Sequence, residues 1–149
     1  MKLKTGFWVL VADGGHGIVF ENKGTAAAPE LKALRAYDQH TPRTHELGRD
    51  KPPRTIQSAD GRRSAQEASD LHQVEEDRFI DRILADLEAD AARSAFNAIA
   101  VVAPPVALGR IRKRASSGLS KRVIAWIDKD FTKHPVPAIA EAVAAALEA

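Results

Sequence analysis

The stretch WVLVADGGHGIVFEN, residues 8–22, decides the fold, because two apolar runs meet there across a pair of glycines. Residues 7–12 are apolar without interruption, which is typical of a strand buried on both faces. Residues 17–21 are rich in β-branched and aromatic side chains and predict a second strand. The Asp-Gly-Gly tripeptide at 13–15 supplies residues that tolerate positive φ, as tight hairpin turns require. The stretch therefore predicts an antiparallel hairpin.

A phosphate-binding loop is the main alternative for this glycine-rich turn. The dinucleotide fingerprint needs such a turn to lead into a helix, whose N-terminus holds the pyrophosphate. Here the turn leads into the strand at 17–21, and the sequence contains no Walker pattern. We therefore interpret the glycines as the bend of a hairpin and expect no nucleotide or other cofactor.

The middle of the chain predicts one more strand and a long helix. Residues 30–38 alternate in polarity, as a half-exposed strand does. Residues 64–93 follow the helical period and predict a helix. At its start, Ser64 and Glu67 have the capping-box spacing. The apolar stripe of this helix consists of Leu71, Val74, Ile80, Ile83, Leu84, Leu87 and Ala91.

The last third of the chain predicts a βαβα unit. Residues 97–103 form a buried type of strand, and two prolines open a helix over 104–114. A last strand at 122–128 precedes an alanine-rich helix at 137–147. A strand–helix–strand unit implies a parallel pair, whereas the first hairpin is antiparallel.

These elements predict one α/β domain over residues 1–149, with a mixed sheet of about five strands. We expect the most continuously apolar strands, 7–12, 97–103 and 122–128, to be the central ones. The hydrophobic content of 44% and charged content of 28% are those of a soluble globular protein.

Composition also excludes several classes of function. The chain has no cysteine, which rules out disulfides, thiolate zinc sites and thiol redox chemistry. The basic start and apolar run of the N-terminus have the look of a short signal peptide, but the run ends at Asp13, and no apolar stretch reaches membrane-spanning length. We expect a cytoplasmic protein without a membrane partner.

The net charge of +2 hides strong local differences. Residues 39–63 hold six basic and three acidic side chains, residues 64–93 hold nine acidic and three basic ones, and residues 109–122 hold six basic and no acidic ones. Such basic segments either contact nucleic-acid phosphates or form a solvated helix end, and stacking aromatics are missing from 109–122. The candidate nucleic-acid-binding residues are Arg43, Arg49, Lys51, Arg54, Arg62, Arg63, Arg110, Arg112, Lys113, Arg114, Lys121 and Arg122.

The segment 39–63 has no periodicity and contains three prolines. Its only large aliphatic residues are Leu47 and Ile56, which give it little to bury against a domain. We expect a mobile loop that becomes ordered when a partner binds. The sequence does not distinguish RNA from protein as this partner. It is also compatible with a homo-oligomer.

Catalytic signals are weak. Asp13, Asp128 and Asp130 follow strands and would meet at one sheet edge to hold magnesium in a nuclease, but we favour turn and helix-cap roles for them. The HQVEE motif at 72–76 lacks the second histidine of the inverted zinc-protease motif and is interpreted as a His–Glu pair on a helix. We therefore expect no resident metal.

Five segments of the chain, in their order, resemble the bacterial host attachment protein family. They are WVLVADGGHGIVFENKG, the Arg/Pro-rich loop, HQVEEDRFIDRILADL, VVAPPVALGRIRKR and IDKDFT. That family is described as required for attachment to host cells. The resemblance implies a relationship to the middle domain of archaeal and eukaryotic class-I peptide release factors and of Pelota. It favours a ribosomal or RNA partner. Because the chain has no convincing export signal and no cysteine, we expect its effect on attachment to be indirect.

In the release factors, a Gly-Gly-Gln motif before a long helix promotes hydrolysis of peptidyl-tRNA. The matching place in this sequence has Gly61, but Arg62 and Arg63 replace the second glycine and the glutamine, and Gln66 comes three residues later. Two arginines remove the backbone freedom that this chemistry uses. The resemblance therefore favours a non-catalytic RNA-binding module. A release-factor-type hydrolase using Gln66, or a metal-dependent nuclease, is the alternative.

Overall fold

A computed structural model describes residues 1–39 and 65–148, with the side chains of 65–69 left out. The elements are β1 (Trp8–Ala12), β2 (His16–Asn22), β3 (Leu31–Asp38), α3 (Ala65–Ala92), β4 (Ile99–Ala103), α4 (Pro105–Arg114), α5 (Ser117–Ser120), β5 (Val123–Asp128) and α6 (Val136–Glu148). The predicted α/β class and the five-stranded mixed sheet are confirmed. The short helix α5 was not expected from the sequence.

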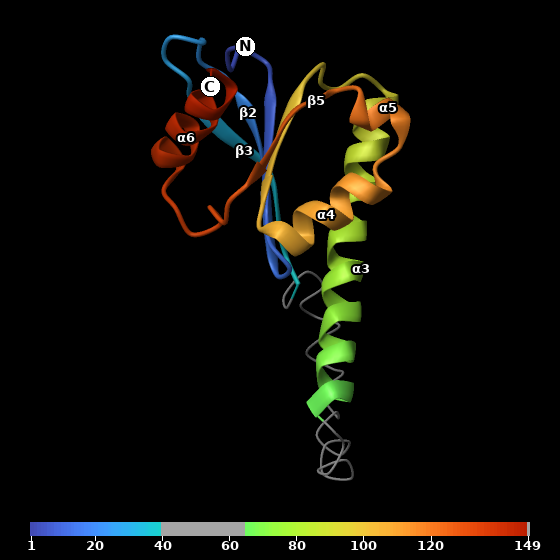
Figure 1. Ribbon diagram of the computed structural model, residues 1–149. Coiled ribbons are helices and arrows are strands. Elements are labelled where there is room, and N and C mark those ends of the chain that lie inside the picture. The colour runs from blue at the N-terminus through green and yellow to red at the C-terminus, as the bar shows by residue number, and fades with distance from the viewer. Residues whose placement is uncertain (40–64, 149) are drawn as a thin grey trace.

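The strand order is β3-β2-β1-β4-β5. β1 pairs antiparallel with β2 and parallel with β4, and β4 pairs parallel with β5. Figure 1 shows three layers, with α3, α4 and α5 on one face of the sheet and α6 on the other. The long crossover through α3 thus carries the chain from β3, at one edge, back to β4 beside the central strand.

The core has two halves, one on each face of the sheet. Trp8, Leu10 and Ala12 of β1 pack toward α3, together with Ile83 and Leu87 of that helix. The intervening β1 residues, Val9 and Val11, pack with α6 on the opposite face. All five residues of β1 are buried, because neighbours cover both faces and both edges of this strand.

The prediction that 122–128 is a central strand is wrong, because β5 lies at the edge of the sheet. Its apolar run reflects covering of both faces rather than a central position. Val123 and Trp126 pack on the α3 side of the sheet, while Ile124 and Ile127 pack on the α6 side. A strand with layers above and below is apolar throughout, even where one edge has no neighbouring strand.

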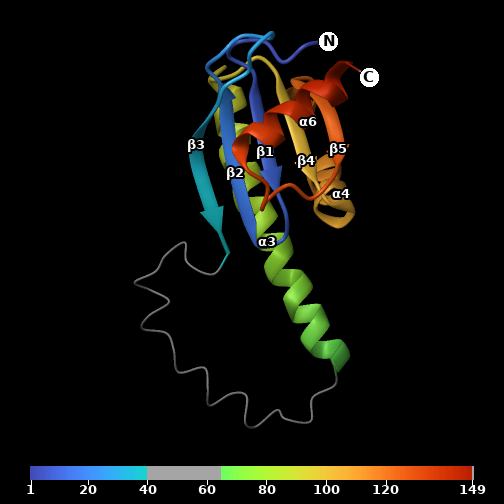
Figure 2. The same cartoon turned by 90° about the vertical axis from the view of Figure 1, so that its left-hand side faces the viewer.

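The predicted apolar stripe of α3 is correct from Ile80 onward and wrong before it. Leu71 is 62% exposed and Val74 42% exposed. At 3.6 residues per turn, Leu71 lies roughly 180° around the helix from Ile80. This first part of α3 also extends past the end of the sheet, as the two views show (Figures 1 and 2), so the sheet does not cover it.

The first hairpin is confirmed, but not by the predicted backbone conformation. Neither Gly14 nor Gly15 has a positive φ; among the described residues, the only glycine that does is Gly6. The turn is closed by the Asp13 amide, which donates to the carbonyl oxygen of His16 at 2.8 Å. A Cβ at Gly14 would lie 2.6 Å from Cδ of Glu76 on α3, so the end of that side chain would have to move aside.

Candidate functional site

A cavity of about 390 Å³ lies where β1 and β4 end, between the hairpin turn, α3 and the first turns of α4. Ligand sites of open α/β sheets commonly occupy this position, at the carboxyl ends of the strands. The polar side chains of the lining come from all three walls. They are Asp13, His16, Gln73, Glu76, Asp77 and Arg110.

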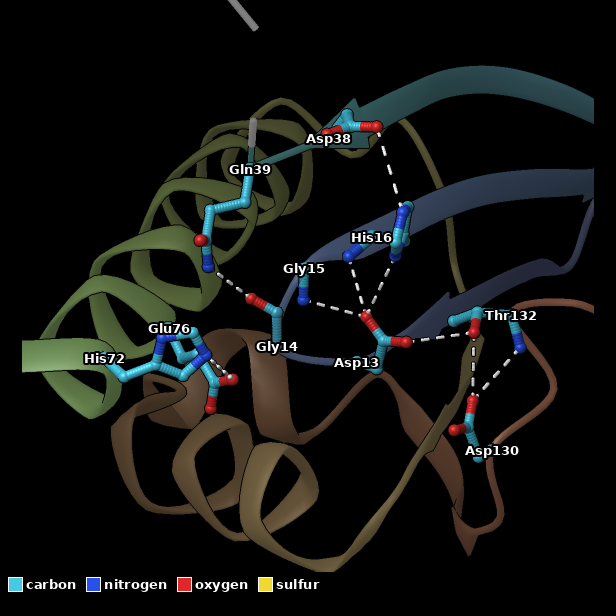
Figure 3. Close-up of polar contacts among 10 residues, drawn as sticks. All are labelled: Asp13, Gly14, Gly15, His16, Asp38, Gln39, His72, Glu76, Asp130 and Thr132. Atoms are coloured by element: carbon cyan, nitrogen blue, oxygen red, sulfur yellow. Dashed lines mark hydrogen bonds and ion pairs between the residues drawn. The ribbon is translucent and has the colours of Figure 1, made fainter. Parts of the chain in front are cut away.

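Asp13 has both carboxylate oxygens engaged (Figure 3). Oδ1 accepts hydrogen bonds from the amides of Gly15 and His16 at 2.8 and 2.7 Å, and Oδ2 accepts one from Oγ1 of Thr132 at 3.0 Å. Partial burial raises the pKa of Asp13, but these hydrogen bonds and the nearby His16 outweigh it and lower the pKa below its usual value. Asp13 therefore holds the turn as an ionised acceptor.

Thr132, in the segment between β5 and α6, connects two of the three candidate aspartates. Its hydroxyl oxygen lies 3.0 Å from Oδ2 of Asp13 and 2.9 Å from Oδ1 of Asp130. Asp128 is exposed at the end of β5. Within residues 1–39 and 65–148, no three His, Asp or Glu side chains are grouped so that they could hold a metal ion.

The two histidines near the cavity each face carboxylates. Nδ1 of His16 lies 3.6 Å from Oδ1 of Asp13, and its Nε2 lies 3.8 Å from Oδ2 of Asp38. Nε2 of His72 lies 3.7 Å from Oε2 of Glu76, one helical turn along α3, which confirms the predicted His–Glu pair. Each histidine, when it is protonated, forms a local ion pair with these carboxylates.

Gln39, which follows β3, also holds the hairpin turn. Its Nε2 donates to the carbonyl oxygen of Gly14 at 2.7 Å, and its amide donates to that of Gly15 at 2.9 Å. Neither Gln39 nor Thr132 was singled out from the sequence. Their roles depend on contacts between segments far apart in the chain.

Arg110 is a predicted nucleic-acid contact that the structure places in an internal ion pair. Its Nε and Nη2 donate to the two oxygens of Asp81 at 3.0 and 2.7 Å, and its Nη1 lies 3.5 Å from Asp77. Nε of Arg114 lies 3.4 Å from the same Asp81. The bidentate hydrogen bond from Arg110 lowers the pKa of Asp81. Acidic side chains of α3 thus offset two of the cations of α4.

Arg122 is engaged as well. Its Nη1 donates to the carbonyl oxygen of Phe96 at 2.6 Å, and its guanidinium lies 6.0 Å from the centre of the Phe96 ring. This contact fixes the start of β5 against the segment that leads into β4.

Three further cations of 109–122, together with Arg114, which stays exposed beside Asp81, lie at the corner where α4, α5 and β5 meet (Figure 1). We call this the basic end and define it as Arg112, Lys113, Arg114 and Lys121, all of which are exposed. The structure adds Trp126 of β5, whose ring centre lies 5.3 Å from Cζ of Arg112. Sequence reasoning missed this residue, because it lies fourteen positions away from Arg112 inside an apolar strand.

The other predicted site residues fall outside the described part of the chain. Gln66 belongs to the first turn of α3, but its side chain is among those left out. The capping box at 64 and 67 and the loop 39–63 beyond Gln39 are likewise outside. The remaining loop candidates in this group are Arg43, Arg49, Lys51, Arg54, Gly61, Arg62 and Arg63.

In the part of the chain that the structure describes, none of the helices combines the length and the apolar character of a membrane span.

Comparison with known proteins identifies a family. No curated protein matches the chain. The family model described as "protein required for attachment to host cells" matches residues 8–143, from the first strand into the last helix. Because the match covers most of its length, this chain belongs to the family of proteins required for attachment to host cells.

Proposed function

We propose that this protein is a non-catalytic module that binds ribosomal or other structured RNA through its basic end, in the cytoplasm, and that its part in host attachment is indirect. The observation that carries the proposal is the exposure of Arg112, Lys113 and Lys121 together at one corner of the fold. Backbone phosphates are the partners that such a cluster attracts without reading sequence.

The contacts made by ionisable groups in the strand-end cavity support a binding function over a catalytic one. Two of its ionisable groups hold the fold together: Asp13 closes the hairpin, and Arg110 joins α4 to α3. A general base or nucleophile needs a lone pair that faces the substrate. The relationship to the release-factor middle domain stays a prediction, and a partner on the ribosome would agree with it.

The test is co-sedimentation with purified ribosomes, together with affinity measurements on a labelled structured RNA across a salt series from about 50 to 300 mM. We expect binding at low salt that weakens steeply as salt rises. The variant K113A/K121A removes two cations of the basic end. The slope of log affinity against log salt should then become shallower by about 1.4–1.8.

The matched control is K23A/K32A, which removes the same charge from exposed positions near the other edge of the sheet, directly after β2 and in β3. It should keep the wild-type slope. No binding at low salt would refute the proposal. An equal decrease of the salt slope in both double variants would also refute the proposal, because binding would then depend on net charge rather than on this corner.

A further inference from the structure

Tertiary structure brings an aromatic ring to the basic end, where the local sequence has none. Trp126 is half-buried in β5 and packs against the core cluster on the side of the sheet that α4 covers. Cζ of Arg112, from the last turn of α4, lies 5.3 Å from the centre of this ring. Arg112 itself is exposed. The guanidinium of Arg112 therefore lies over the ring of Trp126 and still contacts solvent.

This pairing has a specific chemical use. A guanidinium is planar, always charged and weakly hydrated, so it stacks on aromatic rings and offers flat surface to another π system. Unpaired RNA bases bind in this way, on aromatic side chains and on arginine planes. Bases inside a duplex have both faces covered by their neighbours, so a stacking site selects loops, bulges and strand ends.

From these contacts we infer that Arg112 and Trp126 form a stacking site for one unpaired base of single-stranded RNA, with Lys113 and Lys121 beside it for the flanking phosphates. The inference rests on the proposed RNA-binding function and adds the class of RNA. It gives the basic end a preference that a purely electrostatic surface lacks, because phosphates alone do not distinguish a strand with bases from one without them.

The experiment compares a twelve-residue oligoadenylate with an abasic ribose-phosphate strand of the same length and charge. Affinity is measured for both at low salt, and tryptophan emission is followed during each titration. Only two tryptophans are present, and Trp8 is buried. We expect the wild-type protein to bind the strand with bases about 5- to 150-fold more tightly and to lose Trp126 emission only with that strand.

The variant R112K keeps the charge and removes the plane. It should lower the preference for bases to near unity while keeping salt-dependent binding of the abasic strand. R78K makes the same change at an exposed position of α3 outside the basic end and should behave as wild type. Circular dichroism melts establish that both variants are folded, and if R112K is not, R112Q replaces it, with R78Q as control.

Each outcome decides between the two proposals. Equal wild-type affinity for both strands, or an R112K preference as large as that of R78K, overturns the stacking site and leaves electrostatic RNA binding in place. Absence of binding to either strand and to structured RNA at low salt refutes the proposed function, and the stacking site with it.

Discussion

At the scale of single residues, Asn22 shows how one buried amide organises a chain terminus and a turn. It is fully buried at the end of β2. Its Nδ2 donates to the carbonyl oxygen of Leu3 at 2.9 Å, and its Oδ1 accepts from the amides of Gly24 and Glu30 at 2.9 and 2.8 Å. One side chain thus satisfies backbone groups from three segments that have no regular ladder partner there.

We expect Asn22→Ala to destabilise the fold by about 2–4 kcal/mol, because it leaves these buried donors and acceptors unsatisfied. Chemical denaturation gives the free energy of unfolding. Asn97→Ala, the same change at an exposed position, should stay within about 0.5 kcal/mol of wild type. Similar losses at the two positions would contradict the role assigned to Asn22.

Tyr37, in β3, belongs to a polar network that ties the edge strand to α3. Its hydroxyl donates to Oδ2 of Asp86 at 2.6 Å and accepts from Nε of Arg35 at 2.9 Å. Arg35 also pairs with the buried Asp90 at 2.6 Å. Burial of Tyr37, and then the hydrogen bond to Asp86, raises the pKa of its phenol to about 12.

Tyr37 is the only tyrosine, so ultraviolet titration of the phenol reports this site alone. We expect a midpoint near 12 in the folded protein and about 10 in denaturant. A raised pKa means that the folded state holds the proton more tightly. This contribution to stability is therefore complete below about pH 10 and is lost as pH rises toward 12. A folded-state midpoint near the denatured value would contradict the network.

At the scale of elements, the close approach of α3 to the first hairpin depends on Gly17. A Cβ at this position would lie 2.7 Å from Cδ1 of Ile83, which is 1% exposed. Since Ile83 is enclosed by the core, it has little room to move. Gly14 differs, because the atom that a Cβ would meet is the mobile end of Glu76.

We expect Gly17→Ala to cost about 1–3 kcal/mol from overpacking, and Ile83→Val alone to cost about 0.5–1.5 kcal/mol. Ile83→Val removes the very atom that clashes, so the double variant should be more stable than the sum of the two losses implies, by at least about 0.5 kcal/mol. Thermal or denaturant unfolding of the four proteins completes this cycle.

Gly15→Ala is the control, because its Cβ would have no heavy atom nearer than Oδ1 of Asp13, at 4.0 Å. It should change stability by less than about 1 kcal/mol. Additive losses in the Gly17–Ile83 cycle would show that the hairpin and α3 are not in tight contact at this point.

At the scale of the whole molecule, the strand order sets where the fold is most resistant to opening. β1 and β4 have strands on both sides and helices on both faces, whereas β3 and β5 form the edges. Figure 2 shows β3 at the left-hand edge of the sheet, beside β2. Edge strands open without disturbing the centre of the sheet.

Hydrogen exchange on a verified monomer tests this order. The amides of β1 and β4 should exchange most slowly, at rates set by global unfolding, and those of β3 and β5 should exchange faster through local opening. If β5 were as protected as β4, its position as an edge strand in solution would be contradicted.

The sequence by itself determined the features that depend on neighbours along the chain. The apolar runs of β1 and β4, the turn at Asp13 and the start of α4 at Pro105 were all predicted, because local patterning and turn chemistry specify them. The mixed sheet followed from the connections between these elements.

Tertiary structure decided what depends on how distant elements dock. It placed β5 at an edge, left Leu71 exposed, paired Arg110 with Asp81 and brought Arg112 over Trp126. The apolar and basic character of these residues could be read from the sequence, but their partners could not. The physical reason is that an exposed cation and an ion-paired one look alike in a sequence, and only the packing of α3, α4 and β5 distinguishes them.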